Sequence, residues 1–252
     1  EAYRRIRNTS RFILGNLYDF NPGTDRVPYA EMTEMDRWIL HRLQEVIRRV
    51  RDAYEQYQFH VVYTTLYNFC TVDLSSLYLD VLKDRLYTSK AASTARRSAQ
   101  TAMTAILEAM VQLLAPILTF TAEETWLALP AYPGKAESVH LTRFPEVNET
   151  CLQNELAEKW KTLIAVKGEV AKAIEAARAN KILGHSLDAS VTLSGPEKLR
   201  TFLSAHLDDL RALLIVSDVR IVDEKAGSEA SRSAEIAGLS VSVGRAPGEK
   251  CN

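Results

Sequence analysis

Helical periodicity is the feature of this sequence that most constrains its fold. In the N-terminal part, apolar residues recur every three or four positions, as expected for helices that bury one face. The clearest seam alternates spacings of four and three along Ile39, Leu43, Val46, Val50, Ala53 and Tyr57. Such a seam is typical of antiparallel bundles whose helices cross at about 20°. The sequence therefore predicts a mostly α chain that begins with a helical bundle.

Turn and capping signals divide this part into separate helices. Thr33 and Asp36 predict an N-cap and an acidic first turn, and Ser93 opens another helix that Pro116 ends or bends. Thr121 with Glu124 resembles a capping box. The polar segment "TVDLSS" is expected to interrupt or kink its helix, because Asp and Ser compete for backbone hydrogen bonds. The predicted helices start at Tyr3, directly after Thr33, at Phe59 (running to Tyr87), at Ser93 and at Thr121.

The pattern changes after "ESVHLTRFP" (137–145), which we expect to be a short extended piece. A long helix over 149–182, with Gly184 as its C-cap, precedes alternating segments that predict strands. These strands are expected at 186–194, 214–222 and 238–244, with a helix over 197–213 and a loop over 223–238. We place the domain boundary near 145–150, so that residues 1–147 form the bundle and residues 148–252 a smaller α+β domain.

The composition excludes several classes of protein. A net charge of −1 argues against coating nucleic acid by bulk charge, although local basic faces remain possible. No apolar run approaches the ~20 residues of a membrane span, and the N-terminus does not resemble a signal peptide. Without an initiator Met, the chain is expected to be excised from a longer one. Three scattered cysteines, Cys70, Cys151 and Cys251, fit a reducing, cytoplasmic location.

Rows of basic residues are the strongest candidates for a binding function. Guanidinium groups one helical turn apart can contact successive phosphates of a nucleic-acid backbone. The alternative is a solvated outer face, or ion pairs with Asp80 or Asp84 inside the bundle. Two neighbouring helices with arginine-rich faces favour an RNA-binding groove. Its candidate residues are Arg4, Arg7, Asn8, Arg11, Arg37, His41 and Arg48, with Arg96 and Arg97 as its expected extension.

No motif predicts catalysis by these residues. The sequence contains neither GxxxxGK[ST] nor GxGxxG, and no histidine lies in the context of a nucleophile elbow. Cys70 falls on an apolar helix face, where an inert buried thiol is expected. The tyrosines could stack on bases, but most have the spacing of core residues. We therefore predict no catalytic residue.

Four segments together resemble the anticodon-binding region of bacterial isoleucyl-tRNA synthetases, which are class I enzymes. These segments are "YRRIRNTSRFILGNLYDFNP", "DRWILHRL", "DLSSLYLDVLKDRLY" and "LLAPILTFTAEETW". The similarity continues through "GEVAKAIEAARANKILGHSLDASVTL" and "LLIVSDVRIV". It implies a module that binds the anticodon stem-loop of tRNA-Ile and that works in cis with a catalytic body and a zinc module. Neither DNA nor a membrane is expected as a partner.

The same resemblance explains the final "GEKCN". In this family a similar turn leads into a structural zinc module with four thiolate ligands, so Cys251 would be the first ligand of an incomplete site. We expect no zinc bound by this chain alone. The parent ligase would use ATP with Mg²⁺ and a structural Zn²⁺. Because the HIGH-type and KMSKS-type signatures are missing, this piece is predicted to be inactive by itself.

Three alternatives remain open at this point. The module could belong to a valyl or leucyl enzyme, which shares the broader helical plan. The chain could be a helical interaction module whose basic faces are only solvated. An autonomous enzyme is the third alternative, which the missing nucleotide motifs disfavour.

Overall fold

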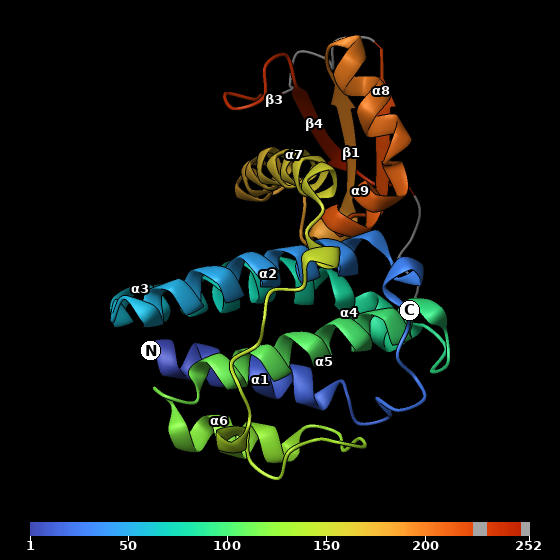
Figure 1. Ribbon diagram of the computed structural model, residues 1–252. Helices are drawn as coiled ribbons and strands as arrows, with labels where there is room; N and C mark the ends of the chain where they lie inside the picture. Colours follow the sequence, from blue (N-terminus) through green and yellow to red (C-terminus); the bar gives the residue numbers. More distant parts are fainter. Residues whose placement is uncertain (224–230, 248–252) are drawn as a thin grey trace. The chain divides into compact units, whose positions relative to one another are not determined.

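A computed structural model describes residues 1–223 and 231–247, which divide into two compact units, Glu1–Ala157 and Glu158–Asn252. The units are mostly α and α+β, respectively, as predicted (Figure 1). The boundary between them follows Ala157 rather than residue 147. Residues 148–157 stay with the bundle because α2 (Glu34–Glu55) holds their backbone: Gln44 accepts a hydrogen bond from the Asn148 N–H.

No helix in the described part of the chain combines the length and apolar character needed to cross a membrane.

Unit 1 is a bundle in which α2 packs against α3 and α5, while α1 packs against α5 and the helical segment after α3. Figure 1 shows α1 and α5 side by side, with α6 beyond them. The helices are α1 (Ala2–Gly15), α2, α3 (Phe59–Asn68), α4 (Leu79–Thr88), α5 (Thr94–Leu114) and α6 (Thr119–Ala128), with short 3₁₀-helices at Tyr29–Glu31, Val139–Leu141 and Glu149–Cys151.

The predicted seam of α2 forms the core of this unit. Ile39, Leu43, Val46, Val50 and Ala53 are all buried. The last member of the seam, Tyr57, is 80% exposed instead. Its φ of 56° is left-handed, and α2 ends at Glu55, two residues before the predicted periodicity ends.

The predicted interruption at "TVDLSS" is confirmed as a π-helical segment, η2 (Phe69–Tyr78), inserted between α3 and α4. Hydroxyl groups compete for the backbone there: Ser76 donates to the Thr71 carbonyl, and Thr71 donates to the Tyr67 carbonyl. A π-helix of this length is rare. The interruption thus widens the helix without ending it.

A buried carboxylate joins three helices of the bundle. Asp36 in α2 is fully buried and forms an ion pair of 2.9 Å with Arg85 in α4. Its oxygens also accept hydrogen bonds from Tyr78 (2.7 Å) and from Ser98 in α5 (2.5 Å). Sequence spacing indicated only an acidic first turn for Asp36. In the fold the same carboxylate instead neutralises a cation from a neighbouring helix.

The predicted helix caps have mixed outcomes. Ser93 caps α5 as predicted, because its hydroxyl accepts a hydrogen bond from the Arg96 N–H. Thr33 holds the N-cap position of α2, but its hydroxyl donates to the Asp36 carboxylate. The capping box at Thr121 and Glu124 is wrong, since α6 starts two residues earlier, at Thr119.

In its described residues, unit 2 combines a four-stranded sheet of order β2-β1-β4-β3 with three α-helices and a short 3₁₀-helix at Ser186–Asp188. Strand β1 pairs in parallel with β2 and antiparallel with β4, and β3 pairs antiparallel with β4. The connection from β1 to the parallel β2 runs through α8 and α9. The elements are α7 (Asn154–Ala179), β1 (Ala189–Ser194), α8 (Glu197–Ala205), α9 (Leu207–Leu214), β2 (Asp218–Val222), β3 (Ser231–Arg232) and β4 (Ser240–Arg245).

Several predicted boundaries in this half are wrong. The piece 137–145 contains a 3₁₀-helix rather than a strand, and α7 ends at Ala179, before a left-handed Lys181 instead of at Gly184. The helix over 197–213 is broken at His206, which separates α8 from α9. A left-handed Ile215 (φ 52°) delays the second strand until Asp218. Local backbone turns, which leave no periodic signature, account for these differences.

Candidate nucleic-acid interface

An exposed polar stripe runs along α1. Ile6 and Ile13 bury the opposite side of this helix in the bundle. Arg4, Asn8 and Arg11, spaced by four and three residues, are all exposed on one face. Within residues 1–223 and 231–247, no ion pair or side-chain hydrogen bond engages any of the three. Arg4 and Arg11 are thus two helical turns apart, a rise of about 10.5 Å along the helix axis, and among the described residues neither guanidinium has a partner that would compete with an anionic ligand. We refer to Arg4, Asn8 and Arg11 as the α1 stripe.

Arg7 lies on the flank of α1 and is engaged within the bundle. Its Nη2 donates to both carboxylate oxygens of Glu124 in α6, at 3.0 and 3.3 Å. A neighbouring contact between the hydroxyls of Tyr3 and Thr121, at 3.1 Å, joins the same two helices. The expected partners Asp80 and Asp84 do not take this role. Arg7 remains partly exposed, and exposed ion pairs of this kind contribute only about 0–1 kcal/mol.

The predicted row on α2 is divided between the surface and the interior. Arg48 is exposed and forms an ion pair of 3.3 Å with Glu149. Arg37 is half-buried, and its Nε finds no hydrogen-bond partner. His41 is only 3% exposed, and its Nδ1 accepts a hydrogen bond of 2.9 Å from the Gln153 N–H. The outer-face position predicted for His41 is therefore corrected, because the segment after residue 147 covers it.

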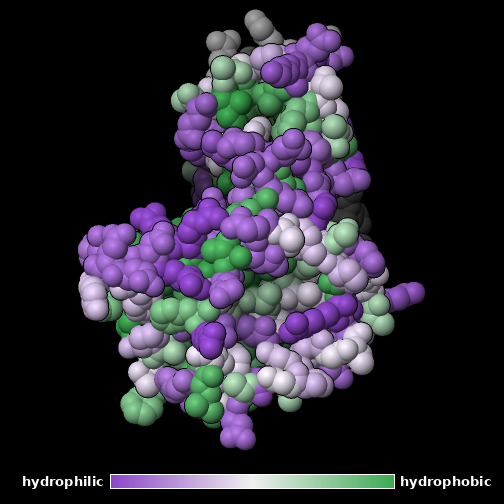
Figure 2. All heavy atoms as spheres, viewed as in Figure 1, coloured by the Kyte–Doolittle hydropathy of each residue, from purple (hydrophilic) through white to green (hydrophobic). Residues whose placement is uncertain are grey.

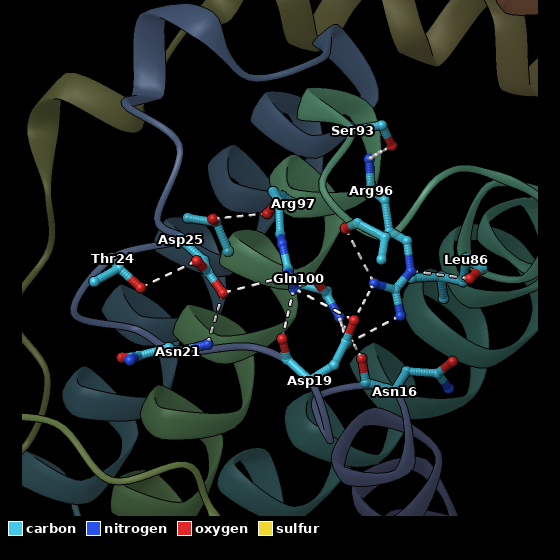
Figure 3. A network of polar contacts seen from close by, with 12 residues as sticks. Asn16, Asp19, Asn21, Thr24, Asp25, Leu86, Ser93, Arg96, Arg97 and Gln100 are labelled. Atoms are coloured by element: carbon cyan, nitrogen blue, oxygen red, sulfur yellow. Dashed lines mark hydrogen bonds and ion pairs between the residues drawn. The ribbon is translucent and has the colours of Figure 1, made fainter.

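Arg96 is buried and Arg97 is part-buried, and both lie in one network of polar contacts (Figure 3). Arg96 is 4% exposed, and its guanidinium grips the Asp19 carboxylate at 2.5 and 3.0 Å. Arg97 donates to the Asp19 carbonyl and forms an ion pair with Asp25. Hydrogen bonds from Arg96 hold the pKa of the Asp19 carboxyl below its ordinary value of 3.8. These two arginines tie α5 to the loop after α1, which leaves them little capacity for RNA.

Arg49 is an exposed cation that the helical spacing did not select. It lies on α2 beside Arg48 and lines two shallow grooves between α2 and the α3–η2 segment. Carboxylates share these grooves: Glu45 lines both, with Asp52 in one and Asp73 in the other. Such mixed charge weakens the attraction for a polyanion. Sequence spacing did not select Arg49, because its exposure beside α3 depends on tertiary packing.

Asp73 in the second of these grooves is bound within the bundle. Arg42 forms an ion pair of 3.3 Å with it and also contacts Glu45. Burial raises the pKa of the Asp73 carboxyl above its ordinary value of 3.8, and the Arg42 charge opposes this rise. The groove therefore presents an internal ion-pair cluster rather than free cations.

No metal centre is visible among the described residues, where no three His, Cys, Asp or Glu side chains come together. Cys70 and Cys151 are buried. Burial raises the pKa of the Cys70 thiol to about 12, which makes it a poor metal ligand. Cys251, the proposed first zinc ligand, lies outside the described residues.

Hydrophilic residues cover much of the face shown in Figure 2, and hydrophobic residues are scattered among them. At the α1 stripe, where two exposed arginines have no acidic partner among the described residues, the available chemistry is the binding of anions. None of the described arrangements offers an activated nucleophile or a paired general acid and base.

Comparisons with known proteins agree with this chemistry. The chain is 47% identical over 251 residues to an isoleucine–tRNA ligase of Geobacter sulfurreducens and 49% identical over 253 residues to that of Moorella thermoacetica. Each match covers 100% of this chain but only 27% of the relative. Among solved structures, the chain resembles Agrobacterium radiobacter K84 LeuRS, which was solved in a ternary complex. The match covers 83% of this chain and 21% of the LeuRS chain, with 15% identity and a TM-score of 0.40. This structural likeness is too low to support an inference.

A family model described as the anticodon-binding domain of tRNA ligases matches residues 36–193, which is more than half of the chain. The matched residues begin at Asp36, so they include the buried Asp36–Arg85 ion pair and α2 to α6. The α1 stripe precedes them. This chain belongs to the family of anticodon-binding domains of tRNA ligases.

Proposed function

We propose that the chain is the tRNA-recognition part of an isoleucine–tRNA ligase and that it contacts the anticodon stem-loop of tRNA-Ile through unit 1. The α1 stripe is the observation that carries this proposal. Arginines that are exposed and unpaired keep their hydrogen-bonding capacity for an external anion. Phosphate contacts of this kind fix the register of the RNA, while unpaired bases supply sequence specificity.

We take five exposed or partly exposed cations of unit 1 as the phosphate contacts. Arg4 and Arg11 are free, Arg49 is exposed, and the ion pairs of Arg7 and Arg48 are exposed enough to exchange for phosphate at low cost. Each contact contributes about −0.7 to −0.9 to the slope of log affinity against log salt concentration. The expected slope is therefore about −3.5 to −4.5.

In the parent ligase, we propose that a separate catalytic body uses ATP and Mg²⁺ to join isoleucine to tRNA-Ile in the cytoplasm. This chain contains neither HIGH nor KMSKS, so it is expected to be inactive alone. Cys251 would be the first of four thiolates that hold a structural Zn²⁺ together with residues beyond this chain. Because a single thiolate does not close such a site, metal analysis of this chain is expected to find less than one zinc per molecule.

Fluorescence anisotropy with a labelled tRNA-Ile anticodon stem-loop tests the RNA-binding proposal. We expect binding at low salt, loss of affinity along the slope given above, and better competition by unlabelled tRNA-Ile than by tRNA-Val or tRNA-Leu. Equal competition by all three would contradict the isoleucine assignment. Absence of binding at low salt would contradict RNA recognition by this chain altogether.

The ion pairs support a second candidate function, a helical interaction module that does not bind RNA. Four of the predicted contact residues already have acidic partners: Arg7, Arg48, Arg96 and Arg97. If this function is correct, the α1 stripe is only solvated, and the stem-loop competes no better than an unrelated RNA of equal length.

A further inference from the structure

A groove opens where α1 ends, next to the C-terminal turn of α4. Its volume of about 420 Å³ lies within the range of about 300–1,000 Å³ that is usual for small-ligand sites. The α1 stripe leads directly into it, because Arg11 lines the groove and Gly15 continues the same helix face by four residues. The lining residues are Arg11, Phe12, Gly15, Asn16, Tyr18, Leu86, Tyr87 and Arg96. We call this the Tyr18–Tyr87 groove.

The charge of the Tyr18–Tyr87 groove suits an anion. No aspartate or glutamate is among its lining residues, whereas both grooves beside α2 contain two carboxylates each. Arg96 is neutralised by Asp19, which leaves Arg11 as the exposed, unpaired cation of the lining. A phosphate at Arg11 would therefore meet no opposing carboxylate from the groove itself.

Two exposed tyrosines line this groove. Tyr18 is 81% exposed and Tyr87 is 65% exposed, far more than core packing requires. The Arg96 guanidinium lies 5.9 Å from the centre of the Tyr18 ring, within range of a cation–π contact that orients the ring. Arg96 is itself fixed by Asp19 and by the Leu86 carbonyl, so the cation of this contact has a defined position (Figure 3).

Aromatic rings beside an unpaired arginine are the usual components of sites for single-stranded nucleic acid. We propose that the Tyr18–Tyr87 groove holds one unpaired nucleotide of the bound RNA, with its base stacked on a tyrosine ring and its phosphate at Arg11. This inference rests on the proposed function, because the α1 stripe must first carry the RNA backbone to the groove. It adds a role for Tyr18, Tyr87 and Gly15 that the basic rows alone did not indicate.

The test measures binding of two labelled RNAs to the same variants. One is the tRNA-Ile anticodon stem-loop, and the other is its stem as a blunt duplex without the loop. Tyr18→Ala and Tyr87→Ala remove the stacking surfaces, and Tyr57→Ala is the matched control because Tyr57 is a comparably exposed tyrosine at the end of α2. Gly15→Glu adds bulk and negative charge where a new Cβ meets open space, and Gly15→Ala is its control.

Loss of a stacked base weakens binding by about 5- to 140-fold. We expect this loss for the stem-loop with Tyr18→Ala or Tyr87→Ala, an unchanged salt slope, and no loss for the blunt duplex. Gly15→Glu is expected to weaken stem-loop binding, whereas Tyr57→Ala and Gly15→Ala leave it unchanged. Far-UV circular dichroism confirms that each variant is folded.

Three results would overturn the inference. Stem-loop binding equal to wild type in both tyrosine variants would refute stacking in this groove, and the proposed function would stand. Equal weakening of stem-loop and duplex would show that the tyrosines do not take an unpaired base. If the wild-type chain binds neither RNA, the proposed function fails and this inference fails with it.

Discussion

Removal of the Asp36 carboxylate is the perturbation whose cost follows most directly from the structure. Asp36 is fully buried and accepts five hydrogen bonds, of which Arg85 donates two, at 2.9 and 3.0 Å. Asp36→Ala leaves the Arg85 guanidinium in the bundle without its counter-charge. Breaking a buried pair by removing one partner costs about 3–5 kcal/mol of unfolding free energy. We expect a loss in this range for unit 1.

Urea unfolding followed by tryptophan fluorescence measures this loss. Trp38 and Trp126 report on unit 1, and a Trp160→Phe background removes the signal of unit 2. With a urea dependence of about 2 kcal/mol per M, the midpoint should fall by about 1.5–2.5 M.

A second variant separates loss of the charge pair from loss of packing. Replacing both partners, as in Asp36→Leu with Arg85→Met, removes the unpaired charge, and such replacements are often neutral. The buried hydroxyls of Tyr78 and Ser98 then lack their acceptor, so about 1–3 kcal/mol for each should remain lost until Tyr78→Phe and Ser98→Ala are added. A midpoint shift below about 0.5 M for Asp36→Ala alone would refute the view that this ion pair is desolvated and integral to the bundle.

Three further predictions concern the bundle. The hydrogen bonds from Arg96 hold the folded-state pKa of Asp19 below its ordinary 3.8, so the ionised carboxylate stabilises the fold fully above pH 3.8 and less as the pH falls through the lowered pKa. The difference in unfolding free energy between wild type and Asp19→Asn should therefore disappear towards about pH 2. A difference that stays constant with pH in urea titrations would contradict this. Burial raises the pKa of Cys70 to about 12, so peptide mapping after iodoacetamide at pH 8 should find Cys70 unmodified in the folded chain and modified in urea. Ser93→Ala removes the N-cap of α5 and should lower the unfolding free energy by about 0.5–1 kcal/mol, measured by urea unfolding, and an unchanged value would show that the cap contributes nothing.

The sequence predicted those features of the fold that periodicity encodes. The seam of α2, the stop of α5 before Pro116 and the cap at Ser93 follow from spacing and local chemistry. The end of α2 before Tyr57 and the break at His206 depend on the backbone conformation of single residues. The spacing of apolar residues carries no information about such conformations. Long periodic elements were therefore more predictable than their ends.

The candidate interface was less predictable, because helical spacing does not show which outer faces are covered. The sequence places both Arg4 and Arg96 on outer helix faces. In the fold Arg96 is buried and forms an ion pair with Asp19 of a loop distant in sequence. His41 is covered by the segment that contains Gln153. Nothing in the sequence around Tyr18 indicated that its ring is exposed, because this depends on how the bundle packs.

The α1 stripe is tested most directly by reversing its charge. Arg4→Glu with Arg11→Glu changes two residues that have no partner among the described residues, whereas reversing Arg7 would also repel Glu124. The matched control is Lys181→Glu with Lys198→Glu, which makes the same charge change at exposed positions of unit 2 that also have no ion-pair partner among the described residues. In anisotropy titrations of the tRNA-Ile stem-loop, the stripe variant should lose at least about tenfold in affinity, and its salt slope should be shallower by about 1.4–1.8, while the control stays near wild type. Stripe and control variants with equal affinities and equal salt slopes would contradict RNA recognition by α1.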